Sequence, residues 1–108
     1  MGERRYRGVG MEYKGFQIYS TPFPVLRELL GHITEWHPTG TIDYRRWDQS
    51  LVEITRFRLP SMTFDEREIA EHFGLELGRL LVDACYRDLV IARYESEKAR
   101  VQRSRSRR

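Results

Sequence analysis

Alternating hydrophobic and polar positions in the first half of the chain predict strands. Residues 12–20 alternate aromatic and aliphatic side chains with polar ones, and a period of two is typical of a strand with one buried face. Pro22 and Pro24 end this strand, because proline has no N–H to donate to a sheet. Residues 51–59 repeat the alternation and predict a further strand, which Pro60 closes.

The segment between these strands allows two interpretations. Leu26, Leu29, Leu30 and Ile33 have helical spacing, whereas Gly31 would interrupt such a helix. We favour a strand that ends at Trp36, followed by a turn at residues 37–40. Residues 41–50 either extend a hairpin or form a loop.

The second half of the chain predicts one long helix. Thr63 is followed three residues later by Glu66, which is the spacing of a capping box. The helical pattern then runs without a break past Tyr94. Together these elements predict an α+β fold of the order β-β-β-α. In this fold a three-stranded antiparallel sheet, with room for an extra hairpin, packs on one long C-terminal helix.

Two apolar stripes follow the predicted helix, and a three-stranded sheet can cover only one of them, roughly 100° wide. The stripe that we expect to face the sheet consists of Ile69, Phe73, Leu77, Leu80, Ala84 and Ile91. The second stripe consists of Leu75, Gly78, Val82, Cys85, Leu89 and Ala92. Its heptad-like spacing and small residues suit the close approach of another helix. We therefore expect a homodimer, or a larger assembly, through the second stripe; the alternative is that residues 21–50 fold over it.

Charge divides the chain into three parts. Residues 1–10 carry three arginines and one glutamate, and residues 100–108 carry five arginines and no acid. Residues 11–99 hold 11 basic and 15 acidic residues, so the net charge of +3 comes from the two ends. We expect a flexible basic leader at 1–10, a single domain at 11–98, and a disordered arginine-rich tail at 99–108, which is too charged to bury anything.

Nucleic-acid binding is the alternative function, because the predicted outer face of the sheet combines arginine with aromatic residues. Arginine binds phosphates and base edges, and aromatic rings stack on bases. The candidate face consists of Tyr13, Tyr19, Trp36, Arg45, Arg46, Trp47, Arg56 and Arg58. Solvent-exposed faces of antiparallel sheets commonly carry the same residue types without binding anything.

The sequence contains no pattern that predicts catalysis. His32, His37 and His72 have no histidine four residues away that would suggest a zinc site. Cys85, the only cysteine, is predicted to be a small buried hydrophobe. We expect no catalytic residue, metal, cofactor or small-molecule ligand. No segment approaches the ~20 apolar residues that span a bilayer, so we expect no membrane partner and a cytoplasmic location.

Two segments together resemble a known group of proteins. They are the first strand, Tyr13-Lys14-Gly15-Phe16, and the helix that starts with Thr63-Phe64-Asp65 and carries Gly78-Arg79 and Asp83. Both are similar to segments of small bacterial β-β-β-α domain proteins of unknown function. The resemblance implies a fold and no activity.

Overall fold

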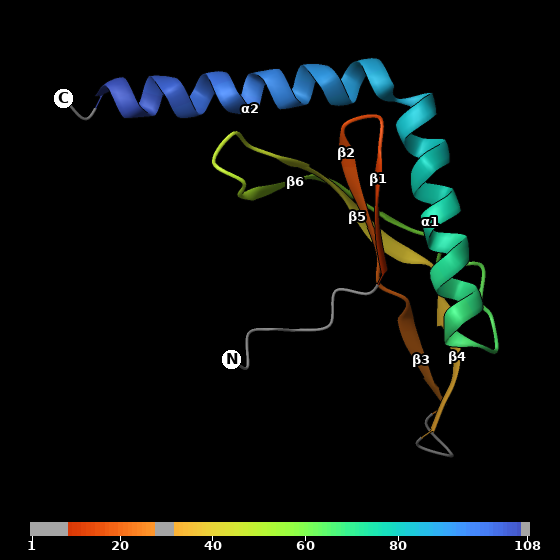
Figure 1. The fold of residues 1–108 in the computed structure, drawn as a ribbon. Coiled ribbons are helices and arrows are strands. Elements are labelled where there is room, and N and C mark those ends of the chain that lie inside the picture. Colours follow the sequence, from red (N-terminus) through yellow and green to blue (C-terminus); the bar gives the residue numbers. More distant parts are fainter. Residues whose placement is uncertain (1–8, 28–31, 107–108) are drawn as a thin grey trace.

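The computed structural model describes residues 9–27 and 32–106 (Figure 1). Within these residues, six strands come first and two helices follow. The elements are β1 (Val9–Tyr13), β2 (Phe16–Ser20), β3 (Phe23–Arg27), β4 (His32–His37), β5 (Thr39–Arg45), β6 (Leu51–Arg58), α1 (Arg67–Ala84) and α2 (Tyr86–Ser106).

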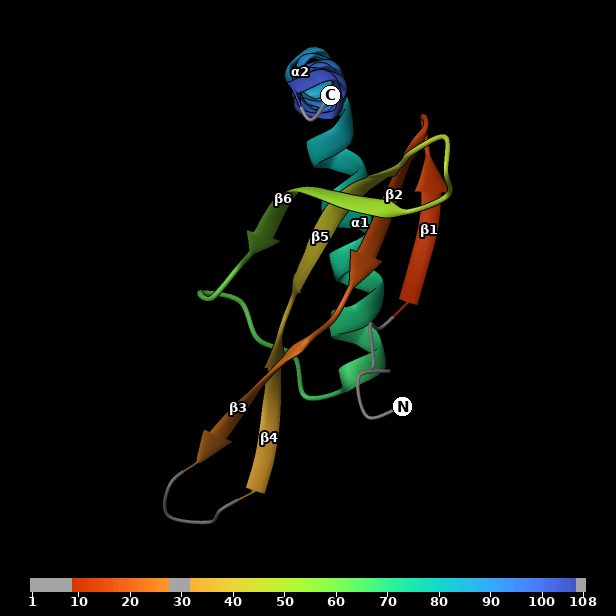
Figure 2. The ribbon, with the colours of Figure 1, turned by 90° about the vertical axis from the view of Figure 1, so that its left-hand side faces the viewer.

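The strands form two antiparallel sheets. Four of them lie in the order β1-β2-β5-β6, and β3 pairs separately with β4. Figures 1 and 2 show that β3 and β4 project from the ends of β2 and β5 as the far part of one long hairpin. Pro22 and Pro38 lie where the two sheets separate, because neither residue can donate a backbone hydrogen bond. The α+β class and the antiparallel pairing are confirmed, but the three-stranded sheet is wrong.

The predicted strand 12–20 is a hairpin, which is one source of the extra strands. Lys14 and Gly15 both have positive φ, 51° and 85°, as a two-residue type I′ turn requires. Tyr13 therefore pairs with Phe16 across the turn. The preferred strand ending at Trp36 is confirmed by β4, although the predicted turn at 37–40 is wrong, because the chain passes from β4 directly into β5.

The single predicted helix is broken in two. Cys85, with φ −115° and ψ 20°, interrupts the helical conformation, and α2 leaves at a large angle to α1 (Figure 1). The first helix begins at Arg67, and its N-cap residue Glu66 makes no side-chain capping bond. The predicted capping box is absent because the preceding segment pairs with β4: Phe64 and Trp36 exchange two backbone hydrogen bonds of 2.9 Å.

The second helix extends to Ser106, so residues 99–106, predicted to be disordered, are helical. Ala99, Arg100 and Gln102 are good helix formers. Arg100 also lies 3.6 Å from the carboxylate of Glu97, three residues earlier on the same helix, where an ion pair supports helical structure. Helical structure therefore continues past residue 98, and strand β1 begins at Val9, two residues before the predicted start of the domain.

The core lies between α1 and one face of the four-stranded sheet, mainly against β2 and β5 (Figure 2). The side of α1 that meets the sheet carries small residues at every turn, including Gly74 and Gly78, which are both buried. A Cβ atom on Gly78 would collide with Cγ2 of Ile18 and lie 3.3 Å from Phe57 Cζ. Glycine therefore allows the helix to approach the sheet closely. The core cluster comprises Phe16, Ile18, Ile42, Tyr44, Phe57, Val82 and Leu89.

Candidate functional site

The apolar stripe that was predicted to face the sheet lies largely on the surface. Leu80 is 65% exposed and Ile69 48% exposed; Ala84 is also exposed, and Phe73 and Leu77 are half-buried. These five residues form a continuous apolar side of α1, which we call the α1 flank. Ile91, the sixth member of the predicted stripe, is exposed on α2 and is separated from the flank by the break at Cys85.

Part of the sheet beside the flank is uncovered because one helix is narrower than this sheet. Strands lie about 4.8 Å apart, so four of them span about 15–19 Å, whereas a helix with its side chains is about 10–12 Å wide. The first helix packs on β1, β2 and β5. The edge strand β6 lies beside the helix, displaced from it in Figure 2, so nothing in the described chain covers the space between them.

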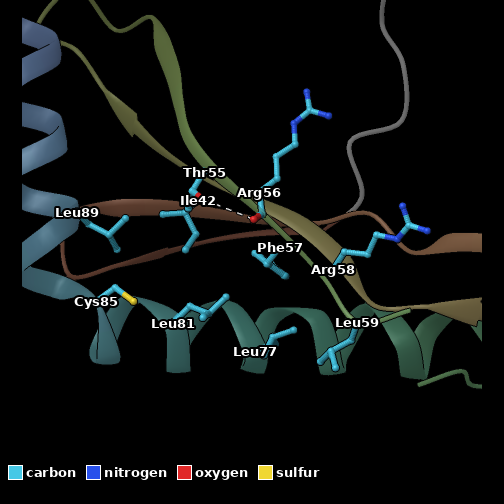
Figure 3. Close-up of a pocket in the computed structure, with 10 residues that line it drawn as sticks. All are labelled: Ile42, Thr55, Arg56, Phe57, Arg58, Leu59, Leu77, Leu81, Cys85 and Leu89. Carbon is cyan, nitrogen blue, oxygen red and sulfur yellow. Dashed lines mark hydrogen bonds between the residues drawn. The ribbon is translucent and has the colours of Figure 1, made fainter. Parts of the chain in front are cut away.

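An open groove of about 490 Å³ lies between α1 and β6 (Figure 3). Leu77 and Leu81 of α1 point toward Ile42 and Phe57 of the sheet, whereas the side chains of Arg56 and Arg58 point away from the helix. The groove is therefore apolar, and Leu77 makes it continuous with the α1 flank. The remaining lining residues are Thr55, Leu59, Cys85 and Leu89.

Cys85 was predicted to be a small buried hydrophobe, and that prediction is wrong. The residue is exposed because it lies at the break between the two helices. There it lines the mouth of the groove.

The acidic residues near the outer border of the flank are ion-paired within the chain. Arg79 Nη1 donates to Glu76 Oε1 at 2.9 Å. Lys14 Nζ donates to Asp83 Oδ1 at 2.6 Å, and the hydroxyl of Tyr13 donates to the same carboxylate at 2.8 Å. The bond from Lys14, followed by that from Tyr13, lowers the pKa of Asp83, and the Asp83 carboxylate raises the pKa of Lys14. Partners within the chain therefore neutralise both acids.

The predicted oligomer interface is not an open surface, because most of it packs inside this chain. Val82 is fully buried and Leu89 nearly so, Gly78 lies against Ile18, and Leu75 packs on the core. Ala92 is half-buried on α2, and Cys85 lines the groove. Helical periodicity defines two stripes without saying which one meets the sheet. The signal that could have decided it was the pair Gly74 and Gly78, which belong to the face of closest approach.

The eight residues of the predicted nucleic-acid face do not form one surface. Tyr13 bonds to α1 through Asp83, and the ring of Trp36 lies 5.5 Å from the guanidinium carbon of Arg67. Tyr19, Arg56 and Arg58 share the outer face of the sheet, because Tyr19 pairs with Thr41 and Thr41 with Arg56, next but one to Arg58. Arg45 is the last residue of β5, and Arg46 and Trp47 belong to the turn between β5 and β6, beside α2.

Arg56 is also partly neutralised on that outer face. Its Nε lies 2.7 Å from Glu53 Oε2. The sheet therefore does not present the continuous basic face that the sequence predicts.

Comparisons with known proteins add no relative. No protein-family model, curated protein or solved structure matches the chain, so the resemblance to small bacterial β-β-β-α proteins stays a prediction. Within residues 9–27 and 32–106, no three His, Cys, Asp or Glu side chains are grouped so that they could hold a metal ion. In the same ranges, no helix combines the length and apolar composition needed to cross a membrane.

Proposed function

We propose that this protein is a non-catalytic interaction module that assembles as a homodimer through the α1 flank. The observation that carries the proposal is the exposure of Leu80 at the centre of an apolar helix side that opens into an apolar groove. Soluble monomers rarely leave large contiguous apolar patches in water. Burying one leucine side chain contributes about 1.5–3 kcal/mol, so covering the flank and the groove supplies a substantial driving force for association.

The spacing of the flank suits a helix as the partner element. Ile69, Phe73, Leu77, Leu80 and Ala84 follow one another at intervals of four, four, three and four residues. Intervals of three and four generate the seam of a coiled coil. From the first residue to the last the seam is about 22 Å long at 1.5 Å per residue, enough for four turns of a facing helix.

The distribution of charge around this seam is compatible with a second copy of the chain as the partner. The commonest homo-oligomer is a twofold dimer, in which the same surface faces itself, so any unpaired charge would face its own kind. The flank itself carries no charged residue. Glu76 and Asp83 at its border already have partners in Arg79 and Lys14. The surface is therefore apolar, self-compatible and free of the repulsion that would oppose a twofold pair.

The test replaces Leu80 by glutamate and compares it with a matched control. Tyr94 on α2 is 66% exposed, almost the same as Leu80 at 65%, so Tyr94→Glu adds the same charge at a similarly exposed site off the flank. In sedimentation velocity, we expect Leu80→Glu to raise the dimer dissociation constant at least about tenfold, the equivalent of roughly 1.4 kcal/mol. Tyr94→Glu should leave the constant unchanged.

The groove offers an independent readout at Cys85. As the only cysteine, exposed and at the groove, it should react more slowly with a thiol reagent as protein concentration rises and the dimer forms. In Leu80→Glu the rate should stay constant over the same range. Equal dissociation constants for the two glutamate variants would refute the α1 flank as the interface.

A further inference from the structure

The turn between β5 and β6 holds a tryptophan ring in solvent. Trp47 is 74% exposed, yet the turn that carries it is well bonded. The Arg46 N–H donates to Ser50 O at 2.8 Å, and the Gln49 N–H donates to Arg46 O at 2.9 Å. The Asp48 carboxylate also accepts hydrogen bonds from the backbone and the hydroxyl of Ser50. A defined turn therefore presents a large flat ring that packs against little of its own chain.

The second helix brings positive charge to the same place. Its contacts with the turn include Arg100, whose guanidinium carbon lies 5.7 Å from the centre of the Trp47 ring, and Glu97, which lies 3.5 Å from Arg46 Nε. Beyond this anchor the helix projects past the body of the protein (Figure 1). Residues 98–108 contain six basic residues and no acidic one. We call residues 98–106, the helical part of this segment, the basic arm.

We propose that Trp47 and the basic arm together bind single-stranded nucleic acid. The exposed lysine and arginine of the arm, Lys98 and Arg103, would contact phosphates, and Trp47 would stack on an unpaired base. Proteins that bind single strands combine a positively charged track with aromatic rings on which bases stack. The structure supports this pairing because Arg100 links the two parts, lying on the arm and beside the ring.

The composition of the arm favours nucleic acid over a lipid surface. A helix that lies on a membrane has one broad apolar face opposite its basic face, whereas Val101 is the only large apolar residue of the arm. At about 100° per residue, Lys98, Arg100 and Arg103 also point in different directions around the helix. A stacked base, rather than a duplex, suits Trp47 because bases within a duplex already stack on one another.

Fluorescence anisotropy of the full chain with a labelled oligothymidylate of about 20 nucleotides provides the test. We expect Trp47→Ala to weaken binding about 5- to 150-fold, the range found when a stacking ring is removed. We expect Lys98→Gln/Arg103→Gln to reduce the slope of log affinity against log salt by about 1.4, or about 0.7 per lost phosphate contact. The control Arg58→Gln/Arg87→Gln removes the same charge from exposed sites away from the arm and should change both quantities little.

Four results would overturn the proposal. They are the absence of binding by the wild type, an equal loss in the control, an unaltered affinity in Trp47→Ala, and equally tight binding to phosphatidylserine vesicles. Unaltered affinity in Trp47→Ala would mean that the arm attracts nucleic acid only by nonspecific electrostatics. The dimer proposed above is tested separately, because Trp47→Ala should sediment as the wild type does whether or not it binds the oligonucleotide.

Discussion

Replacing Gly78 by alanine tests how closely α1 approaches the sheet. Alanine favours a helix by about 1 kcal/mol over glycine, so a loosely packed helix would become more stable. In this structure the added methyl group would collide with Ile18 Cγ2 and lie 3.3 Å from Phe57. Ile18 is fully buried and β-branched, so it has little freedom to move away. Overpacking of this kind costs about 1–3 kcal/mol, and the stiff neighbours place Gly78→Ala near the upper end.

The net expectation for Gly78→Ala is a loss of about 1–2 kcal/mol, after subtraction of the gain in helix propensity. For a domain of this size that loss lowers Tm by about 5–10 °C. Thermal and urea unfolding followed by circular dichroism, at one fixed protein concentration, measures it. His72→Ala on the exposed side of α1 is the control, and its stability should stay within about 0.5 kcal/mol of wild type, on the stabilising side.

A double mutant separates collision from other causes. Ile18→Ala removes the colliding Cγ2 atom and by itself costs about 2–5 kcal/mol through the cavity that it leaves. Because it also makes room for the new methyl group, Gly78→Ala should cost less in the Ile18→Ala background than in wild type. Strict additivity, or a Gly78→Ala variant more stable than wild type, would show that the helix does not rest on Ile18.

Two further predictions concern polar contacts between the sheet and α1. Removing the Ser20 hydroxyl, which is buried and donates to Glu71 O at 2.7 Å, should cost about 1 kcal/mol; an unchanged urea midpoint in Ser20→Ala would contradict that contact. The wild type should be more stable than Asp83→Asn by a constant amount between pH values near 3.8 and 10.5, the ordinary pKa values of Asp83 and Lys14. Because the folded-state pKa of Asp83 is lowered, this difference should disappear as the pH falls through that lower value; because the pKa of Lys14 is raised, it should also disappear as the pH rises through that higher value. Urea unfolding across the pH range measures the difference, and one that persists at both extremes would contradict the ion pair.

The α+β class, the strand at β6 and the helical second half could be predicted from the sequence, because each depends on local periodicity. The hairpin at Lys14-Gly15 was missed because a period of two was continued through the two-residue turn. That period puts Tyr13 and Phe16 on opposite faces, whereas in the hairpin these residues pair and share a face. The signal was the glycine, which readily adopts the positive φ of a type I′ turn. Pro38 led to the opposite error. It was taken as part of a turn, but it only interrupts the strand pairing within a long hairpin, and the chain does not turn there.

The orientation of α1 could not be predicted from periodicity alone. A helix whose apolar surface is wider than one stripe can pack on a sheet in several rotations about its own axis. Which rotation is adopted depends on how closely the backbones of the helix and the sheet approach. Gly74 and Gly78 decide it, because they allow contacts with Ser20 and Ile18 that any larger side chain would block. The stripe that contains Val82, which was expected to lie open, is mostly buried within the chain. The α1 flank is the apolar side that the structure leaves exposed, and its role as an interface is a proposal.

The mass of the wild-type chain in solution tests this central claim most directly. If a second copy covers the α1 flank, sedimentation equilibrium from low to high micromolar concentration should show the average mass rising from the 13.0 kDa of one chain toward twice that value. A mass of 13.0 kDa at every concentration would contradict the account, because Leu80 and the groove beside it would then remain open to water.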